Sequence, residues 1–504
     1  MFPELPVMRA LQRPQLRPAR ILPLMVIVIA ITAVAFAHVW AAAFQELGLK
    51  FLPKADRNFS YFCLIAQYLG LAVLGSFTIA GGLDRDRDSG ILSFHRLTPM
   101  SPDAITIGYI LGLGSTALLV WAAFAVFGLM GVIMGGISLV NYLIVTVLAL
   151  LSGFFFHLLT MLISLSFPQR GAARFFYTAA VSLLPLVVAW IPFDISFLTP
   201  LPAAMMRFDS VEYSSYYSSM EPFTLLGVKM YPLVYTLLLL LAFGSQIYLA
   251  VRRKVRLPEA PELSKAGALL LFSTLILLFA GRSLDYLSGT GSTIADISLP
   301  VFFGLAVMLS IVIIPGRLHF RRYFIRRYQG ERSGSSWSDN ASVLPVSLIM
   351  AGLSILFYLV LLFAENEKLP SGAVTAIVVR SVSMISVLVF MVFLFEWSRL
   401  RLRRNSDWVA GTIVALWWIL PLLIAGSLSM NDDPVSAAYA LGISPLPMLF
   451  ASPDMLKDME GYFYQSFYYM SPSITLTFTI LAMFFGLRAR RRMAAEVALR
   501  RDIG

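Results

Sequence analysis

Long runs of apolar residues recur along the whole chain and are separated by short polar segments. One helical crossing of a hydrocarbon core of roughly 30 Å needs about 20 apolar residues. Twelve windows reach or approach that length, and the predicted spans cover residues 21–44, 61–81, 105–134, 139–166, 175–193, 231–251, 266–281, 297–314, 343–363, 374–395, 408–427 and a last segment ending near residue 487. The pattern therefore predicts an all-α polytopic membrane protein with about 12 transmembrane helices.

Composition and charge favour a membrane protein with both termini in the cytoplasm. Of the 504 residues, 58% are hydrophobic and 13% are charged, whereas soluble domains have roughly 25% charged residues. With both termini inside, the inner segments carry 30 of the 39 Lys and Arg residues, the outer segments carry eight, and Arg380 lies within the tenth span. Cytoplasmic loops retain Lys and Arg in this way. The net charge of +11 is thus a topology signal, which argues against nucleic acid as a partner and fits a bacterial-type inner (cytoplasmic) membrane.

The two halves of the chain show weak internal similarity at a separation of about 245 residues. The segment "FLTPLPAAMM" at 197–206 corresponds to "GISPLPMLFA" at 442–451, and a tyrosine cluster follows each. Each half also closes with an apolar span and an arginine run. We therefore predict a first six-span half at residues 1–260 and a divergent repeat at residues 261–504. Coincidence among apolar segments is the alternative explanation.

An abrupt run of charges begins the predicted cytoplasmic loop between the second and third spans, residues 82–104, which starts "GLDRDRDSGILSFHRLTPMSPD". We expect its first part, residues 84–88, to be a solvated charge run. Ile91, Phe94 and Leu97 follow at helical spacing, which predicts a short interfacial helix with one apolar face.

Sequence signals mark both the end of this short helix and the start of the next one. Thr98 and Pro99 should stop the first helix, because the residue before a proline disfavours the helical conformation. Ser101 is a suitable N-cap, Pro102 fits the first helical position, and Asp103 places an acid in the first turn. The loop is therefore expected to be a structured element rather than a flexible linker.

The stretch "DRDRDSGILSFHRLTPMSPDAITIG" resembles the loop between the second and third spans in permease subunits of type-2 ABC exporters. In that family, alternating acidic and basic residues precede a small residue and glycine, an apolar run, a "TP" with a following serine, and a polar start to the next span. This chain has aspartate where glutamate is usual, and residues 93–96 interrupt a normally more leucine-rich run. The resemblance covers residues 1 to about 260. The second half matches only through the repeat, and its equivalent loop, within residues 316–345, lacks an apolar stripe, so we do not expect it to couple in the same way.

The resemblance implies that the loop helix docks on a separate ATP-binding subunit and transmits its closure to the spans. The coupling residues that it implies are Asp84, Arg85, Asp86, Arg87, Asp88, Gly90, Ile91, Leu92, Phe94, His95, Arg96, Leu97 and Pro99. Six spans form one permease half in this family, so a twelve-span chain would supply both halves above two ATP-binding subunits. Those subunits would bind ATP and Mg²⁺, because the sequence contains no G-x-x-x-x-G-K-[ST] motif. A helix resting passively on the membrane surface, with its polar residues facing headgroups, is the alternative.

The remaining polar residues form no catalytic or metal-binding pattern, so we expect a transport protein and not an enzyme. The four histidines are dispersed, and no acidic pair lies in a predicted span. An ion-coupled carrier is less favoured, because Arg380 is the one ionisable residue well inside a span, where it either snorkels to the outer surface or has a function. Asp432 and Asp433 could serve a membrane-embedded enzyme, but "NDDP" fits a turn equally well. Cys63, the single cysteine, is expected to pack in the core.

Aromatic residues are abundant in the predicted outer loops. Tyr213, Tyr216, Tyr217, Tyr464 and Tyr468 either anchor helix ends at the membrane interface or contact the cargo, and anchoring is the more common role. Uniformly apolar spans fit a lipidic or amphipathic cargo, and the tyrosines fit an interfacial belt equally well. The sequence leaves the transported substrate open.

Overall fold

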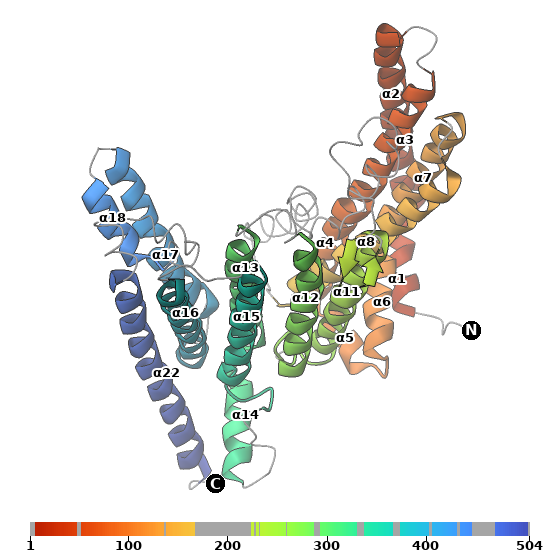
Figure 1. Ribbon diagram of the computed structural model, residues 1–504. Helices are drawn as coiled ribbons and strands as arrows, with labels where there is room; N and C mark the ends of the chain where they lie inside the picture. Colours follow the sequence, from red (N-terminus) through yellow and green to blue (C-terminus); the bar gives the residue numbers. More distant parts are fainter. Residues whose placement is uncertain are drawn as a thin grey trace. The chain divides into compact units, whose positions relative to one another are not determined.

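A computed structural model of the chain describes two compact units. The described residues are 6–47, 52–135, 138–166, 223–225, 228–230, 232–258, 260–286, 293–329, 337–365, 373–402, 406–430, 434–445 and 469–501. The first unit comprises residues 1–223 and 228–258, and the second comprises 224–227 and 259–504. Both units are built from helices (Figure 1). The division after residue 258 lies close to the predicted boundary after residue 260, while the duplication itself stays a prediction.

The first unit contains a series of long apolar helices joined by short ones. Its helices are α1 (Pro6–Gln15), α2 (Pro18–Leu47), α3 (Leu52–Leu69), the π-helical segment η2 (Gly70–Leu74), α4 (Gly75–Asp88), α5 (Ile91–Leu97), α6 (Pro102–Leu113), α7 (Ser115–Gly135), α8 (Leu139–Ser166) and α11 (Pro232–Arg256). Two strands of three residues each, β1 (Phe223–Leu225) and β2 (Val228–Met230), pair ahead of α11.

The long elements of the second unit that the structure describes are also helices. Its helices are α12 (Lys265–Tyr286), α13 (Thr293–Ile313), α14 (Arg317–Tyr328), α15 (Leu344–Glu365), α16 (Ala373–Arg401), α17 (Ser406–Met430), α18 (Pro434–Ile443) and α22 (Ser471–Arg501).

Eight helices within the described ranges are long and apolar enough to cross a membrane. They are Pro18–Ala41, Asn58–Asp88, Ser115–Met134, Leu139–Ser166, Val234–Arg256, Leu344–Leu361, Ile377–Arg401 and Ser471–Leu499. The pair Leu299–Ile313 and Arg317–Arg327, bent by 70°, would make a ninth. Apart from the short hairpin, the described residues therefore fit the predicted all-α polytopic protein, while the number of twelve spans and the side of the termini stay predictions.

Several predicted spans differ in detail from the helices. The predicted seventh and eleventh spans are α12 and α17, whose apolar stretches, Lys265–Phe279 and Val409–Ala425, are shorter than a full crossing. The predicted third span is interrupted at Gly114 and forms the two helices α6 and α7. The predicted fifth span, at 175–193, lies outside the described residues.

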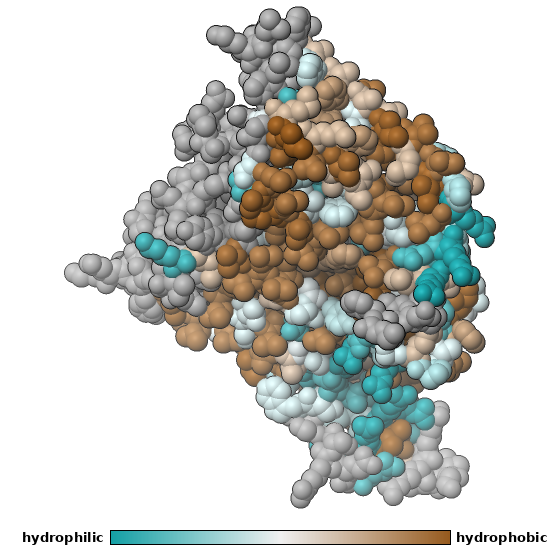
Figure 2. Space-filling model, turned by 90° about the vertical axis from the view of Figure 1, so that its right-hand side faces the viewer, coloured by the Kyte–Doolittle hydropathy of each residue, from teal (hydrophilic) through white to brown (hydrophobic). Residues whose placement is uncertain are grey.

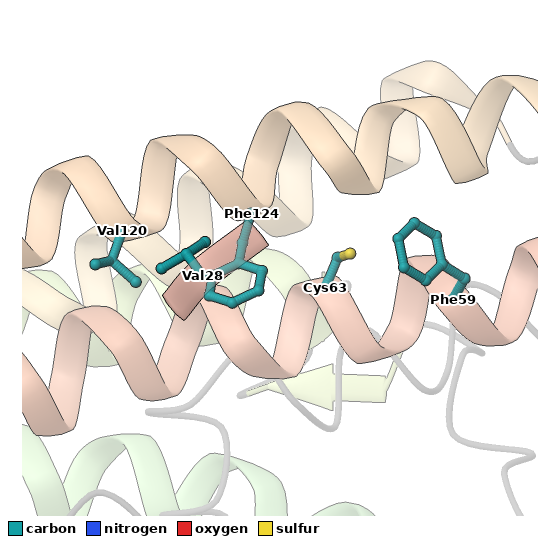
Figure 3. Packing of buried hydrophobic residues seen from close by; sticks show 5 residues of the cluster. All are labelled: Val28, Phe59, Cys63, Val120 and Phe124. Carbon is teal, nitrogen blue, oxygen red and sulfur yellow. The ribbon is translucent and has the colours of Figure 1, made fainter. Parts of the chain in front are cut away.

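The core of the first unit lies where α2, α3 and α7 meet. Val28, Phe59, Cys63, Val120 and Phe124 form one buried cluster, and their side chains point into the interface between these helices (Figure 3). Cys63 is fully buried in this cluster, which confirms its predicted role in core packing. Small residues let helices approach closely in membrane proteins.

Apolar side chains cover much of one face of the described residues. One face shows a broad area of hydrophobic side chains in brown, with hydrophilic side chains in teal gathered at its margins (Figure 2). Helix α2, for example, exposes Leu22, Val26 and Val34. Isolated exposed apolar residues are ordinary in soluble proteins, but a continuous apolar surface of this kind marks a contact with lipid or another protein.

The amphipathic N-terminal helix α1 packs against α6. Val7 is buried, and a Cβ atom added at Gly108 would lie only 2.9 Å from the Val7 side chain. At Gly112, an added Cβ would lie 2.7 Å from Leu11. The two glycines therefore let the backbones of α1 and α6 come close together, which fixes the position of α6 and of the segment that precedes it.

Candidate functional site

The charged run at residues 84–88 is the last part of helix α4 and not a solvated loop. Asp84 and Asp86 are each only 7% exposed, whereas Arg85 and Asp88 are exposed. The prediction of a solvated charge run is therefore wrong for the two inner aspartates. The apolar helix continues into this segment without a break, and neighbouring parts of the protein cover both Asp84 and Asp86 there.

Hydrogen bonds satisfy the buried carboxylates of α4. Tyr109 donates its hydroxyl to Oδ2 of Asp86 at 2.9 Å, and Arg87 donates to Oδ1 of Asp84 at 3.3 Å. Arg87 also donates to the carbonyl of Ser164 at the end of α8. Buried polar groups need such partners, because losing one costs about 1–3 kcal/mol. The charged end of α4 is thereby tied to α6 and α8.

A tight turn joins α4 to the short helix α5. Gly90 has a φ of 80°, the left-handed conformation that glycine adopts without strain. Helix α5 then runs over residues 91–97 and ends at Thr98, with Pro99 following. The predicted short helix is confirmed, and so is its end.

The apolar stripe of α5 faces outward. Ile91 is 43% exposed, Phe94 is 64% exposed and Leu97 is 87% exposed, whereas Leu92 is buried against the protein. Phe94 and Leu97 are thus mostly uncovered by the rest of the chain, and Ile91 is about half covered. Exposed contiguous apolar surface of this kind is typical of a docking or membrane-contact site.

The polar side of α5 faces the protein, whereas the alternative of a passive surface helix would have His95 and Arg96 facing headgroups. Arg96 donates from Nε to the carbonyl of Val255 at 2.9 Å and from Nη2 to that of Lys254 at 3.4 Å. The ring of His95 stands edge-on to that of Tyr109, with centroids 6.1 Å apart.

Partial burial also perturbs these two side chains. Burial lowers the pKa of His95, although nearby Asp86 opposes the shift. Burial and the neighbouring Arg87 lower the pKa of Arg96, which Tyr109 partly offsets. Both effects fit side chains that are drawn into the protein rather than left in solvent.

The start of α6 fixes the other end of the α5 segment. The hydroxyl of Ser101 accepts a hydrogen bond from the backbone N–H of Ala104 at 3.1 Å, which confirms the predicted N-cap. Asp103 accepts a hydrogen bond from Tyr248 at 2.6 Å and pairs with Arg252 at 3.3 Å. Both partners of Asp103 lie on α11.

Arg96 and Asp103 therefore attach the segment to the same end of α11. Helices α4, α5 and α6 and the end of α11 form one connected body, with the apolar stripe of α5 on its outside. The alternation of charges in the sequence gave no sign of the partners Tyr109, Tyr248 and Val255. Asp103, the acid in the first turn of α6, was the one residue of the segment whose contacts the sequence gave a reason to look for.

The second unit carries a different arrangement at the corresponding point of the chain. Helix α14 contains five arginines and follows α13 at a bend of 70°. The residues between α14 and α15 that the structure describes, 337–343, form no helix. An element like α5 is therefore lacking in the described part of this segment.

A buried ionic cluster lies instead among four helices of the second unit. Glu396 is fully buried and pairs with Arg490 of α22. It also accepts hydrogen bonds from the hydroxyl of Ser342 at 2.9 Å and from the backbone N–H of Val343 at 3.3 Å. Lys265 donates to the carbonyl of Ser342 at 2.7 Å. The cluster joins α12, α15, α16 and α22. The hydropathy pattern does not predict it, because the predicted tenth span ends at residue 395 and leaves Glu396 in the loop that follows.

The other predicted residues give no second site. The side chain of Arg380 is buried, with its guanidinium 5.5 Å from the centre of the Tyr358 ring, so it does not snorkel to the surface. The described residues contain no group of three or more His, Cys, Asp or Glu that could hold a metal ion. The predicted outer-loop residues Tyr213, Tyr216, Tyr217, Tyr464 and Tyr468 lie outside the described residues.

Comparisons with protein-family models, with curated proteins and with solved structures find no match to this chain. The functional interpretation therefore depends on the site itself, and above all on the outward apolar stripe of α5.

Proposed function

We propose that this chain is the membrane-spanning permease of an ATP-binding cassette exporter and works with separate ATP-binding subunits. One observation carries the proposal: α5 is a fixed helix whose polar side is anchored to α11 and whose apolar side, Ile91, Phe94 and Leu97, is exposed. A helix with this arrangement can seat in a groove of a rigid soluble partner. The anchors at Arg96 and Asp103 would make it move together with the membrane helices on either side.

The sequence supports a partner that supplies the energy. It contains no phosphate-binding G-x-x-x-x-G-K-[ST] motif, so ATP and Mg²⁺ would be bound by the partner. In this proposal the chain supplies both permease halves, with two ATP-binding subunits on its cytoplasmic side and α5 as the coupling element of the first half. Export is the direction that the family resemblance suggests.

The proposal includes twelve spans with both termini in the cytoplasm, in a bacterial-type inner membrane. Cysteines replacing residues on outer segments should react with an impermeant thiol reagent added to intact cells, and cysteines on inner segments should not. The expected outer positions are Ser138, Ser371 and Asp433, and the expected inner positions are Ser89, Arg253 and Arg322. The native Cys63 is buried and gives little background. Labelling of position 322 from outside would refute this topology.

Purification from native membranes tests the functional proposal. Tagged wild-type chain should hydrolyse no ATP alone and should co-purify with a protein that contains the phosphate-binding motif, identified by mass spectrometry. Phe94→Asp places an unpaired charge in the proposed contact and should abolish recovery of that protein, because such charges are costly in an interface. Leu318→Asp is the matched control, since Leu318 is a comparably exposed apolar residue on α14. Equal recovery with both variants would contradict the proposal.

An ion-coupled secondary carrier is the second candidate function. It is favoured by buried Glu396, which lies within a helix apolar enough to span the membrane, because intramembrane acids often serve in ion coupling. The Arg490 and Ser342 contacts of Glu396 suit a structural role equally well. Transport driven by an ion gradient in vesicles without ATP, and lost in Glu396→Gln, would favour the carrier.

A further inference from the structure

The second membrane-spanning helix contains one segment of π-helix. Residues Gly70–Leu74 form η2, which joins α3 to α4 within the continuous apolar helix Asn58–Asp88. A π-helical turn bonds residue i to residue i+5 and accommodates one residue more than an α-helical turn, and such turns are frequent at functional sites. One residue corresponds to about 100° of helix rotation. The segment therefore sets the rotation of α3 relative to α4.

A buried histidine on α8 contacts this segment. His157 is fully buried, and its Nε2 atom lies 2.8 Å from the carbonyl oxygen of Leu71. A carbonyl can only accept, so Nε2 carries the hydrogen and donates it. The Nδ1 atom of this ring has no hydrogen-bond partner among the residues that the structure describes. Among the described residues, the Leu71 carbonyl is thus the one hydrogen-bond partner of this ring, whose burial is otherwise costly.

Gly75 leaves room for the ring, and Gly114 lies in ordinary contact distance of it. A Cβ atom added at Gly75 would overlap Nε2 of His157 and lie 2.7 Å from its Cε1. A Cβ atom added at Gly114 would lie 3.4 Å from the same Cε1 atom. The backbone at Gly75 therefore fits directly against the imidazole ring, in the position that the π segment gives it.

Contacts on both sides of η2 join this helix to α8. On the α3 side, Gln67 donates to the hydroxyl of Tyr142 at 2.9 Å. On the α4 side, Arg87 donates to the carbonyl of Ser164. If η2 became α-helical without losing a residue, one side would turn by about 100° relative to the other, and these two contacts could not both persist. A π-helical and an α-helical η2 would therefore be two discrete registers of this helix, and the structure shows the π-helical one.

We propose that residues 70–74 are a register switch between the outer and inner parts of this helix, with His157 as the positioning residue that holds the π-helical register. A tight turn at Gly90 connects α4 to α5. A partner that displaces α5 would therefore move α4, which begins directly after η2. In transport, this proposal extends the function proposed above: partner closure would be converted at η2 into rotation of α3 on the outer side.

A deletion experiment tests the register without any partner. Removing Val73 should convert η2 to α-helix and leave α3 and α4 in their present relation, so the first unit should unfold at nearly the wild-type temperature. Removing Ala80, from the regular helix α4, should turn residues 84–88 out of their contacts and lower the midpoint by roughly 10 °C. Unfolding is followed by the reaction of the single cysteine, buried Cys63, with a fluorogenic maleimide. Equal destabilisation by the two deletions would overturn the proposal.

A second experiment tests the switch in the complex with its ATP-binding subunit. A bimane label on Asn58→Cys, exposed on α3, should change its emission when ADP is replaced by ATP and vanadate. The Val73 deletion and His157→Asn should lose the change, because asparagine is too short to place its amide at Nε2. His157→Gln can place its amide there and should retain it.

The two experiments fail in different ways. If the bimane emission of the wild type and of all variants responds alike to ATP and vanadate, the register switch is refuted. If the wild type binds no ATP-binding subunit, the proposed function fails, while the deletion experiment still decides whether η2 contains a surplus residue.

Discussion

Replacing Gly75 by alanine should destabilise the first unit through one atom. The added methyl group would overlap Nε2 of His157. The ring has little freedom to move, because it is fully buried, stands edge-on to Phe154 with centroids 5.9 Å apart and has Gly114 against its other side. The ring would have to give up its hydrogen bond to the Leu71 carbonyl, or α4 would have to shift.

Three terms set the size of the effect. Overpacking a filled site costs about 1–3 kcal/mol, and a buried imidazole N–H left without its acceptor costs about 1–3 kcal/mol. Alanine is better than glycine in a helix by about 1 kcal/mol, which offsets part of the loss. We expect Gly75→Ala to lower the free energy of unfolding by about 2–4 kcal/mol, or the midpoint by roughly 5–15 °C for a unit of this size.

The maleimide reaction of Cys63 on heating measures this change, because the only thiol of the chain is buried in the same unit. Gly81→Ala is the matched control: it lies on the same helix, and a Cβ atom there meets nothing within 4 Å. It should leave the midpoint unchanged or raise it slightly. Adding His157→Ala to Gly75→Ala should recover part of the loss, since neighbouring substitutions are not additive. Equal midpoints for Gly75→Ala and Gly81→Ala would show that the His157 ring does not block a methyl group at position 75.

Three further outcomes follow from other parts of the structure. Ile91→Ala with Leu97→Ala should weaken binding of the ATP-binding subunit about 30-fold, since about 2 kcal/mol of apolar burial is lost. The affinity of the subunit for the chain in nanodiscs measures this loss, and a loss no greater than that of Leu318→Ala would contradict the prediction. Glu396→Ala should lower the free energy of unfolding by about 3 kcal/mol and Glu396→Gln by about 1 kcal/mol, measured by intrinsic fluorescence on heating; equal midpoints would contradict it. Burial lowers the pKa of His95 in the folded protein. The unfolded state therefore binds a proton at this residue first, and the free energy of unfolding should fall as the pH drops through 6.5. If His95→Gln leaves the dependence of that free energy on pH unchanged, His95 is not its source.

The sequence predicted the local features of the site and missed the contacts that join them. Ile91, Phe94 and Leu97 predicted α5, and Ser101 predicted the start of α6, because helical spacing and capping are local properties. The burial of Asp86 could not be predicted, since it depends on Tyr109, which is 23 residues away. When the neighbouring helices are unknown, alternating charges predict a solvent-exposed segment.

Contacts between residues still farther apart in the sequence could not be predicted either. Arg96 contacts Val255 across 159 residues, and Glu396 contacts Arg490 across 94. Hydropathy located most of the helices but assigned Glu396 to a loop, because a charged residue at the end of an apolar run resembles a helix boundary. The π-helical segment left no mark in the apolar pattern either, since a run such as "GLAVL" has no polar position that would reveal its periodicity.

If the exposed apolar stripe of α5 seats an ATP-binding subunit, a photoreactive group on the stripe should crosslink to that subunit. A photoreactive amino acid is placed at Leu97, which is 87% exposed, and at Ile133, an exposed apolar residue of α7, as the control. After irradiation of intact cells, position 97 should give a crosslinked protein that contains a G-x-x-x-x-G-K-[ST] motif, and position 133 should not. Crosslinks from position 97 to lipid alone would show that α5 rests on the membrane and would contradict the account.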